Sequence, residues 1–150
     1  MKNGPGENFV SEAIGAGNQA RGRETLLCAL VFLAGLGVLL QGLWAGIFLE
    51  HDGSRDAAGS WIDVHARGAD ISIGVACLAF VLSVLWFRRD SGLIAGLAAF
   101  IVVMFAESYI GGLIRDNGKD TLTSVHVPLA MAAMGLAAWL AARVWRMRRA

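Results

Sequence analysis

The chain has 150 residues, of which 56% are hydrophobic and 17% are charged, so it is long enough for one domain and too apolar for a typical soluble enzyme. It carries 13 Lys and Arg against 12 Asp and Glu, which gives a formal net charge of +1. That balance creates no basic field, and we expect no nucleic-acid partner. The lipid bilayer is the partner that the composition favours.

Residues 1–24 mix glycine, asparagine and charged residues, and we expect a mobile or loosely helical cytoplasmic tail without a signal-peptide pattern. Four apolar stretches follow, each close to the ~20 residues that a helix needs to cross the bilayer. They are Leu26–Leu49, about Ala69–Phe87, Leu93–Ile114 and about Leu122–Ala142. Because backbone polar groups in lipid must be satisfied within a segment, residues 25–146 are predicted to form an all-α, integral membrane four-helix bundle, followed by a basic end at 147–150.

The basic residues predict the orientation of these helices. Nine of the thirteen fall in the N-terminal tail, the second connection and the C-terminus, whereas the first and third connections hold four. By the positive-inside rule, both termini are expected in the cytoplasm, and the chain is expected to be a multi-pass protein of the cell membrane. The short link 88–90 makes the second and third helices antiparallel neighbours.

The chain also contains an internal repeat. The first apolar stretch ends QGLWAGIFLEHDG from Gln41, and the third ends ESYIGGLIRDNG from Glu107, 66 positions later. Val-His at 64–65 recurs at 125–126, 61 positions later, near the start of the second and fourth stretches. Because polar, small and histidine positions recur in order, we predict two copies of one helical hairpin related by a pseudo-two-fold axis along the membrane normal.

The repeated polar residues share one depth in the predicted bundle. At about 1.5 Å per residue, Gln41, Glu107, His126 and His65 lie roughly 21 to 33 Å from the cytoplasmic helix ends. Polar groups this deep are costly in lipid and usually face the bundle interior. Two histidines at equivalent places would face each other across the axis, which is the geometry that two axial ligands of one metal require. His65 and His126 are therefore the candidate metal ligands.

An iron porphyrin, b-type haem above all, is the cofactor that this pair favours, because neutral imidazole ligates haem iron and the ring needs an apolar slot. Gly111 and neighbouring small residues leave room for a ring, but small residues also let helices pack closely without a cofactor. Arg67 is the candidate partner of the propionates, with a surface pair to Asp70 as the alternative. Glu107 is a candidate to hydrogen-bond an imidazole, to carry a proton or to pair with Gln41.

The arrangement resembles one half of a haem A synthase, a family with two four-helix halves, each with a histidine pair at the outer ends of its second and fourth helices. The resemblance covers about residues 26–146. It is carried by VH at 64–65, by HVPLA at 126–130 and by Glu107-x-x-x-Gly111, where the family often has glutamine before glycine. It implies that His65 and His126 are the axial pair of one haem.

Departures from the family pattern bear on the activity. The family's first half typically has glutamate three residues before the histidine of its second helix and arginine directly after it; Ile62 and Ala66 occupy those places, with Asp63 and Arg67 displaced by one residue. Loop cysteines that many members carry are missing, and one half is present. The resemblance therefore supports porphyrin binding better than oxidation of a porphyrin methyl group, and enzymatic activity stays open.

Two other functions remain open on the sequence. One is a cofactor-free accessory subunit of a larger membrane complex, and the other is a proton or metal-ion pathway through Glu107, Gln41 and the histidines. A haem protein would need a redox partner or a larger membrane complex, and a homo-oligomer is compatible with each function. His51 has no counterpart in the repeat and is expected to be solvated; with Asp63 and His65 it gives a weaker zinc or copper alternative.

Overall fold

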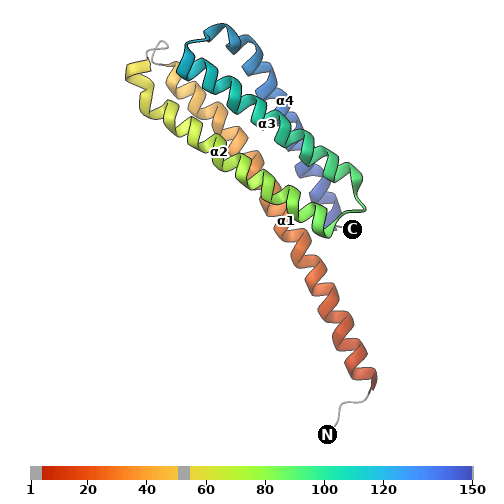
Figure 1. Cartoon of the computed structure of the whole chain (residues 1–150). Helices are drawn as coiled ribbons and strands as arrows, with labels where there is room; N and C mark the ends of the chain where they lie inside the picture. The colour runs from red at the N-terminus through yellow and green to blue at the C-terminus, as the bar shows by residue number, and fades with distance from the viewer. Residues whose placement is uncertain (1–4, 51–54, 150) are drawn as a thin grey trace.

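The computed structural model describes residues 5–50 and 55–149. The described chain is built of four long helices, drawn in Figure 1. They are α1 (Pro5–Leu49), α2 (Arg55–Trp86), α3 (Ser91–Asn117) and α4 (Thr123–Arg149), and a short 3-10 turn η1 (Asp120–Leu122) precedes α4. The described residues contain no strand, so the predicted all-α four-helix class is confirmed.

The four helices form a ring in chain order. α1 packs against α2 and α4, and α3 packs against the same two helices. α2 and α4 are therefore diagonally opposite, as are α1 and α3. The connection between α2 and α3 is short, and the two helices run antiparallel as predicted (Figure 1).

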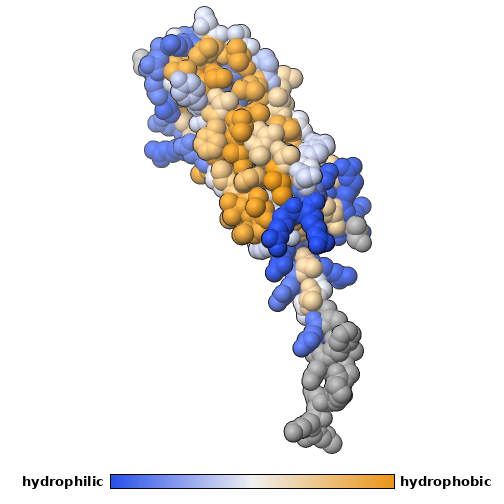
Figure 2. Space-filling model, turned by 45° about the vertical axis from the view of Figure 1, so that its right-hand side comes forward, coloured by the Kyte–Doolittle hydropathy of each residue, from blue (hydrophilic) through white to orange (hydrophobic). Residues whose placement is uncertain are grey.

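Each helix includes a segment long and apolar enough to cross a membrane, which supports the predicted multi-pass membrane protein. Large apolar side chains cover the outward faces of the bundle: Ile71 is 68% exposed and Val102 is 66% exposed. Figure 2 shows apolar residues along the middle of the bundle and polar residues gathered toward its ends. Lipid, which is as apolar as these side chains, is the solvent that suits such a surface.

The helices are longer than the apolar stretches that predicted them. α1 begins at Pro5 and continues without a break from the tail into the bundle, so that its first turns project beyond the other helices (Figure 1). α2 begins at Arg55, 14 residues before the predicted span. Once a span has nucleated a helix, adding a residue costs little, so polar flanking residues without an interrupting proline extend it.

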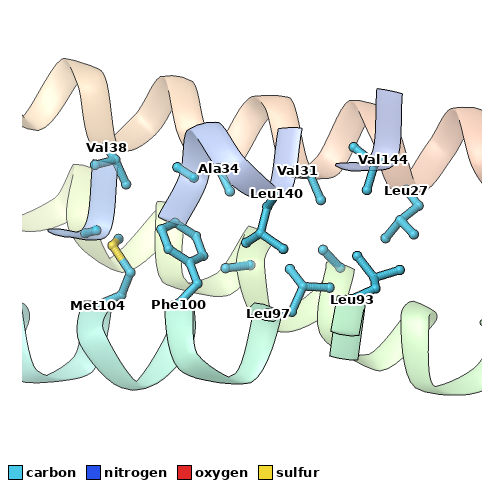
Figure 3. Packing of buried hydrophobic residues seen from close by; sticks show 14 of the residues in the cluster. Leu27, Val31, Ala34, Val38, Leu93, Leu97, Phe100, Met104, Leu140 and Val144 are labelled. Carbon is cyan, nitrogen blue, oxygen red and sulfur yellow. The ribbon is translucent and has the colours of Figure 1, made fainter. Parts of the chain in front are cut away.

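The buried core follows one heptad pattern on all four helices. On each helix four core positions are spaced by four, three and four residues, which is the spacing of the inward seam of a left-handed bundle. They are Leu27, Val31, Ala34 and Val38 on α1, Ser72, Ala76, Ala79 and Ser83 on α2, Leu93, Leu97, Phe100 and Met104 on α3, and Ala133, Ala137, Leu140 and Val144 on α4. Figure 3 shows large side chains of α1, α3 and α4 meeting in this core. We call these segments, 27–38, 72–83, 93–104 and 133–144, the core half.

The core positions of the two hairpins are in the same register. Each core position of α3 follows one of α1 by 66 residues, and each core position of α4 follows one of α2 by 61 residues. These are the two offsets that relate the repeated motifs in the sequence. The hairpins α1–α2 and α3–α4 therefore present equivalent positions to the bundle interior.

Fully buried residues occur in the core half of the bundle and not in the part that continues beyond it. No described residue of 39–47, 59–71, 105–117 or 123–132 is fully buried, although these segments continue the same helices. We call them the histidine half, because they contain His65 and His126. The side chains between the helices there are partly exposed, whereas those of the core half are buried.

At the opposite end of the bundle, Asp90 caps the N-terminus of α3. Its Oδ1 accepts a hydrogen bond from the backbone N–H of Leu93 at 2.9 Å and another from the guanidinium of Arg143 on α4. Burial raises the pKa of the Asp90 carboxyl, but the hydrogen bonds from Arg143 and Leu93 and the charge of Arg143 outweigh it and hold the pKa below its usual range. This contact ties α4 to the turn that joins α2 and α3.

Replacing Asp90 with alanine is expected to lower the free energy of unfolding by about 1 to 2 kcal/mol, since α3 loses its cap and Arg143 its carboxylate. Because the folded-state pKa is lowered, this stabilisation is present above the unfolded pKa near 4 and is lost as the pH falls through the folded pKa. Unfolding in detergent between about pH 5 and pH 3 should therefore change more in the native chain than in the variant. Asp116→Ala, which removes an exposed carboxylate bound to adjacent Arg115, is the control and should change little.

Candidate functional site

The residue types at the inward heptad positions, the inward seam, change where the helices enter the histidine half. One heptad step beyond the core it holds Gln41, Ala69, Glu107 and Ala130, and the next step holds Ala45, His65, Gly111 and His126. In the core half α1 and α3 supply mostly large apolar side chains to this seam, whereas here they supply an amide, a carboxylate and the two smallest residues. Polar groups and missing side-chain volume therefore coincide at this level.

His65 on α2 is held by α1. Its Nδ1 lies 3.2 Å from the backbone oxygen of Gln41. The Gln41 amide satisfies both of its ends when Nε2 donates to the backbone oxygen of His65 at 2.8 Å and Oε1 accepts from the N–H of Ala69 at 3.0 Å. If Nδ1 of His65 carries the proton, it donates to the Gln41 carbonyl and the imidazole lone pair lies on Nε2; if Nδ1 is unprotonated, it accepts instead from Nε2 of Gln41 at 3.1 Å. A histidine that ligates a metal through Nε2 requires the first of these two tautomers.

His126 on α4 is held by α3. Its Nδ1 lies 2.9 Å from Oε2 of Glu107, and the two side chains are only 21% and 12% exposed. The angle departs from that of a good hydrogen bond, and among the described residues Nδ1 of His126 and Oε1 of Glu107 have no well-formed hydrogen bond. A proton on Nδ1 of His126 suits this contact, and it again assigns the lone pair to Nε2.

Two glycines sit beside these contacts. A Cβ at Gly68 would overlap the ring of Trp44 and come within 2.8 Å of the Gln41 side chain, so a larger residue at this position would displace both side chains. A Cβ at Gly111 would lie 3.5 Å from Cε1 and 3.9 Å from Nε2 of His126, which is ordinary contact distance. Gly111 therefore faces the edge of the imidazole that bears Nε2.

The structure brings together five of the six predicted site residues, in two groups: Gln41 with His65, and Glu107 with His126 and Gly111. Glu107 contacts His126, which is one of the roles that the sequence left open for it.

The sixth predicted residue, Arg67, is exposed, and within 5–50 and 55–149 it forms no ion pair with Asp70. His51, with its proposed zinc or copper role, lies outside the described residues. The sequence reasoning missed Trp44, which packs against Gly68; its position one helical turn after Gln41 was the signal that would have found it.

The two histidines belong to diagonally opposite helices, and the Nδ1 of each lies beside an oxygen of the helix that precedes it in the chain. Within the described part of the chain, no group of three or more His, Cys, Asp or Glu side chains is placed to hold a metal ion. The site therefore offers two imidazoles, with a carboxylate behind one and a backbone carbonyl behind the other. A metal held here would need its remaining ligands from elsewhere.

These features define a class: a multi-pass, four-helix membrane bundle with two histidines on its inward seam. No protein-family model, curated protein or solved structure matches the chain.

Proposed function

We propose that the chain is an integral membrane b-type haem protein, with one haem ligated by His65 and His126 near the outer face of the membrane, and with electron transfer or a haem A synthase-like step as its role. The observation that carries the proposal is the pair of imidazoles at equivalent seam positions on opposite helices, each with its Nδ1 beside an oxygen of the preceding helix. An acceptor oxygen at Nδ1 is typical of histidines that ligate a metal through Nε2.

The residues present fit a porphyrin better than a bare metal ion. Haem brings four nitrogen ligands of its own and needs only axial ligands from the protein, so two imidazoles suffice where no larger ligand group is found among the described residues. The alanines and Gly111 on the seam leave the interior short of side chains at the level of the histidines. Arg67 is our candidate for the propionates, because it is exposed close to His65.

The internal repeat and the orientation are part of the proposal. The offsets of 66 and 61 residues that relate the motifs also relate the four heptad core positions of each helix, which supports two duplicated hairpins around a pseudo-two-fold axis. That symmetry relates His65 to His126 and Gln41 to Glu107. The basic residues at the end that bears the C-terminus support cytoplasmic termini, which would put the histidine half toward the outer side.

Two axial histidines favour electron transfer over chemistry at the iron, because no iron position is left for a substrate. Haem would supply a one-electron redox couple, and this chain would hold and orient the axial imidazoles and keep water from them. A redox partner or a larger membrane complex would supply and accept the electron.

The apolar packing of the core half supports electron transfer over a proton or metal-ion pathway. Its two buried serines, Ser72 and Ser83, donate hydrogen bonds to backbone carbonyls of their own helix.

An absorption spectrum of the purified chain tests the proposal. Protein from haem-replete cells should be red, with the bands of six-coordinate low-spin haem, and pyridine extraction should give b-type haem at about one per chain. A colourless preparation whose spectrum does not change when haem is added would contradict it. The accessory-subunit alternative predicts that second result.

The two imidazoles are held differently, and this predicts unequal effects of their partners. Glu107→Ala removes the carboxylate that lies 2.9 Å from Nδ1 of His126 and should weaken haem binding by roughly 10- to 100-fold. Glu107→Gln keeps an acceptor oxygen and should retain most of the affinity. Gln41→Ala leaves the backbone carbonyl that His65 uses and should also cost less than Glu107→Ala.

Haem titration of the apoprotein, followed by the Soret band, measures these affinities. Equal losses in Glu107→Ala and Gln41→Ala would contradict the unequal support of the two histidines.

A further inference from the structure

A second feature lies on the lipid-facing surface between α1 and α4, in the core half and far from the histidines. It is a shallow, open groove of about 330 Å³ lined by Phe32, Ala141, Ala142 and Trp145. The two rings meet edge to face with their centroids 6.2 Å apart. Phe32 is 47% exposed and Trp145 is 41% exposed, so the bundle itself does not cover the groove.

Two arginines lie next to this groove. The guanidinium carbon of Arg149 is 4.7 Å from the centroid of the Trp145 ring, and that of Arg148 is 5.9 Å from it. Both belong to the basic last turn of α4, at the polar end of the bundle seen in Figure 2. Across residues 5–50 and 55–149, neither of them forms an ion pair with a carboxylate.

We propose that the groove and these arginines bind one anionic phospholipid, with an acyl chain against Phe32, Ala141 and Trp145 and the phosphate at Arg148 and Arg149. An acyl chain has no polar atoms, and it suits an apolar groove at membrane depth. Arg148 and Arg149 follow Trp145 by about one helical turn, and their guanidiniums lie over its ring at the polar end of the groove, where the headgroup of such a lipid would be. Their charge favours a headgroup with net negative charge over a zwitterionic one. The site is independent of the haem proposal.

The other hairpin supplies an internal comparison. The positions 61 residues before Trp145, Arg148 and Arg149 hold Val84, Phe87 and Arg88, so the ring and one of the two arginines are missing there. The residue equivalent to Phe32, 66 positions later, is Ala98. Arg88 and Arg89 thus offer two exposed positive charges at the same end of the bundle without the aromatic groove.

Native mass spectrometry of the full chain in a non-ionic detergent tests the proposal, with phosphatidylglycerol and phosphatidylcholine as probes. One phosphatidylglycerol should bind with higher affinity than phosphatidylcholine, and millimolar inorganic phosphate should not displace it. The double variant Arg148→Gln, Arg149→Gln should weaken phosphatidylglycerol binding by about tenfold to thirtyfold. The control, Arg88→Gln with Arg89→Gln, should stay near the native affinity. Ala142→Phe, which fills the groove and keeps the arginines, should also lose the bound lipid.

Three results would overturn the proposal. Equal affinities for the two lipids would remove the charge selectivity. Equal losses in the two arginine variants would point to diffuse attraction between a basic surface and an anionic lipid. A protein that copurifies on this face in place of lipid and is released by Trp145→Ala would identify the groove as a contact for another chain. Circular dichroism of each variant verifies that the helices are intact.

Discussion

Replacement of either His65 or His126 by alanine is expected to abolish the six-coordinate low-spin haem spectrum of the purified chain. Under the haem proposal each variant removes one of the two axial ligands, so any haem that remains should be five-coordinate and loosely held. Both single variants are expected to lose the low-spin spectrum, because under the proposal the two histidines belong to different hairpins and share one iron. Absorption and electron paramagnetic resonance spectra measure the coordination state directly.

The matched control for this experiment is His51→Ala, which removes the remaining histidine and should leave the spectrum unchanged. Membrane insertion and the monodispersity of each variant should stay as in the native chain, since the core half is untouched. If both histidine variants keep the native spectrum, His65 and His126 are not the ligands. If neither the native chain nor any variant binds haem while complexes with other membrane proteins persist, the accessory-subunit function takes the place of the haem proposal.

Phe100→Ala is expected to be the most destabilising single change in the core half. Phe100 is only 2% exposed and packs among side chains of the other helices, so truncation should leave a cavity that costs roughly 3 to 5 kcal/mol of unfolding free energy. Phe105→Ala, five residues further along α3, is the control: Phe105 is 55% exposed, and its removal should cost much less. Reversible unfolding in mixed micelles measures both. Equal losses would mean that the heptad seam does not define the buried face of α3.

The sequence was sufficient to predict four membrane helices, because the length of an apolar stretch reports directly on its ability to cross a bilayer. It did not reveal where the buried face of each helix lies. In a soluble bundle polar residues mark the outside, but here lipid-facing residues such as Val102 are as apolar as core residues such as Leu97, so the heptad pattern is hidden in the hydropathy. On α2 the seam is Ser and Ala, which makes it weaker still.

The candidate site was predictable in part, and for a physical reason. Glu107 and the histidines are costly in lipid, so their inward position could be expected from residue type alone. The sequence could not predict which polar group contacts each histidine. The choice between a side chain and a backbone carbonyl depends on the exact positions of the neighbouring helices. The Gln41 carbonyl that accepts from His65 has no signal in the sequence.

The unbroken heptad register has a consequence for how such a chain can vary. One residue inserted into α2 between Ser72 and His65 would turn the imidazole by about 100° around the helix axis, from the interior toward the acyl chains. An insertion or deletion of seven residues nearly restores the facing of the seam, but it shifts the ring by about 10 Å along the helix axis. The segments from the core to the two imidazoles are therefore fixed in length, and changes in chain length are confined to the connecting loops and the ends of the helices.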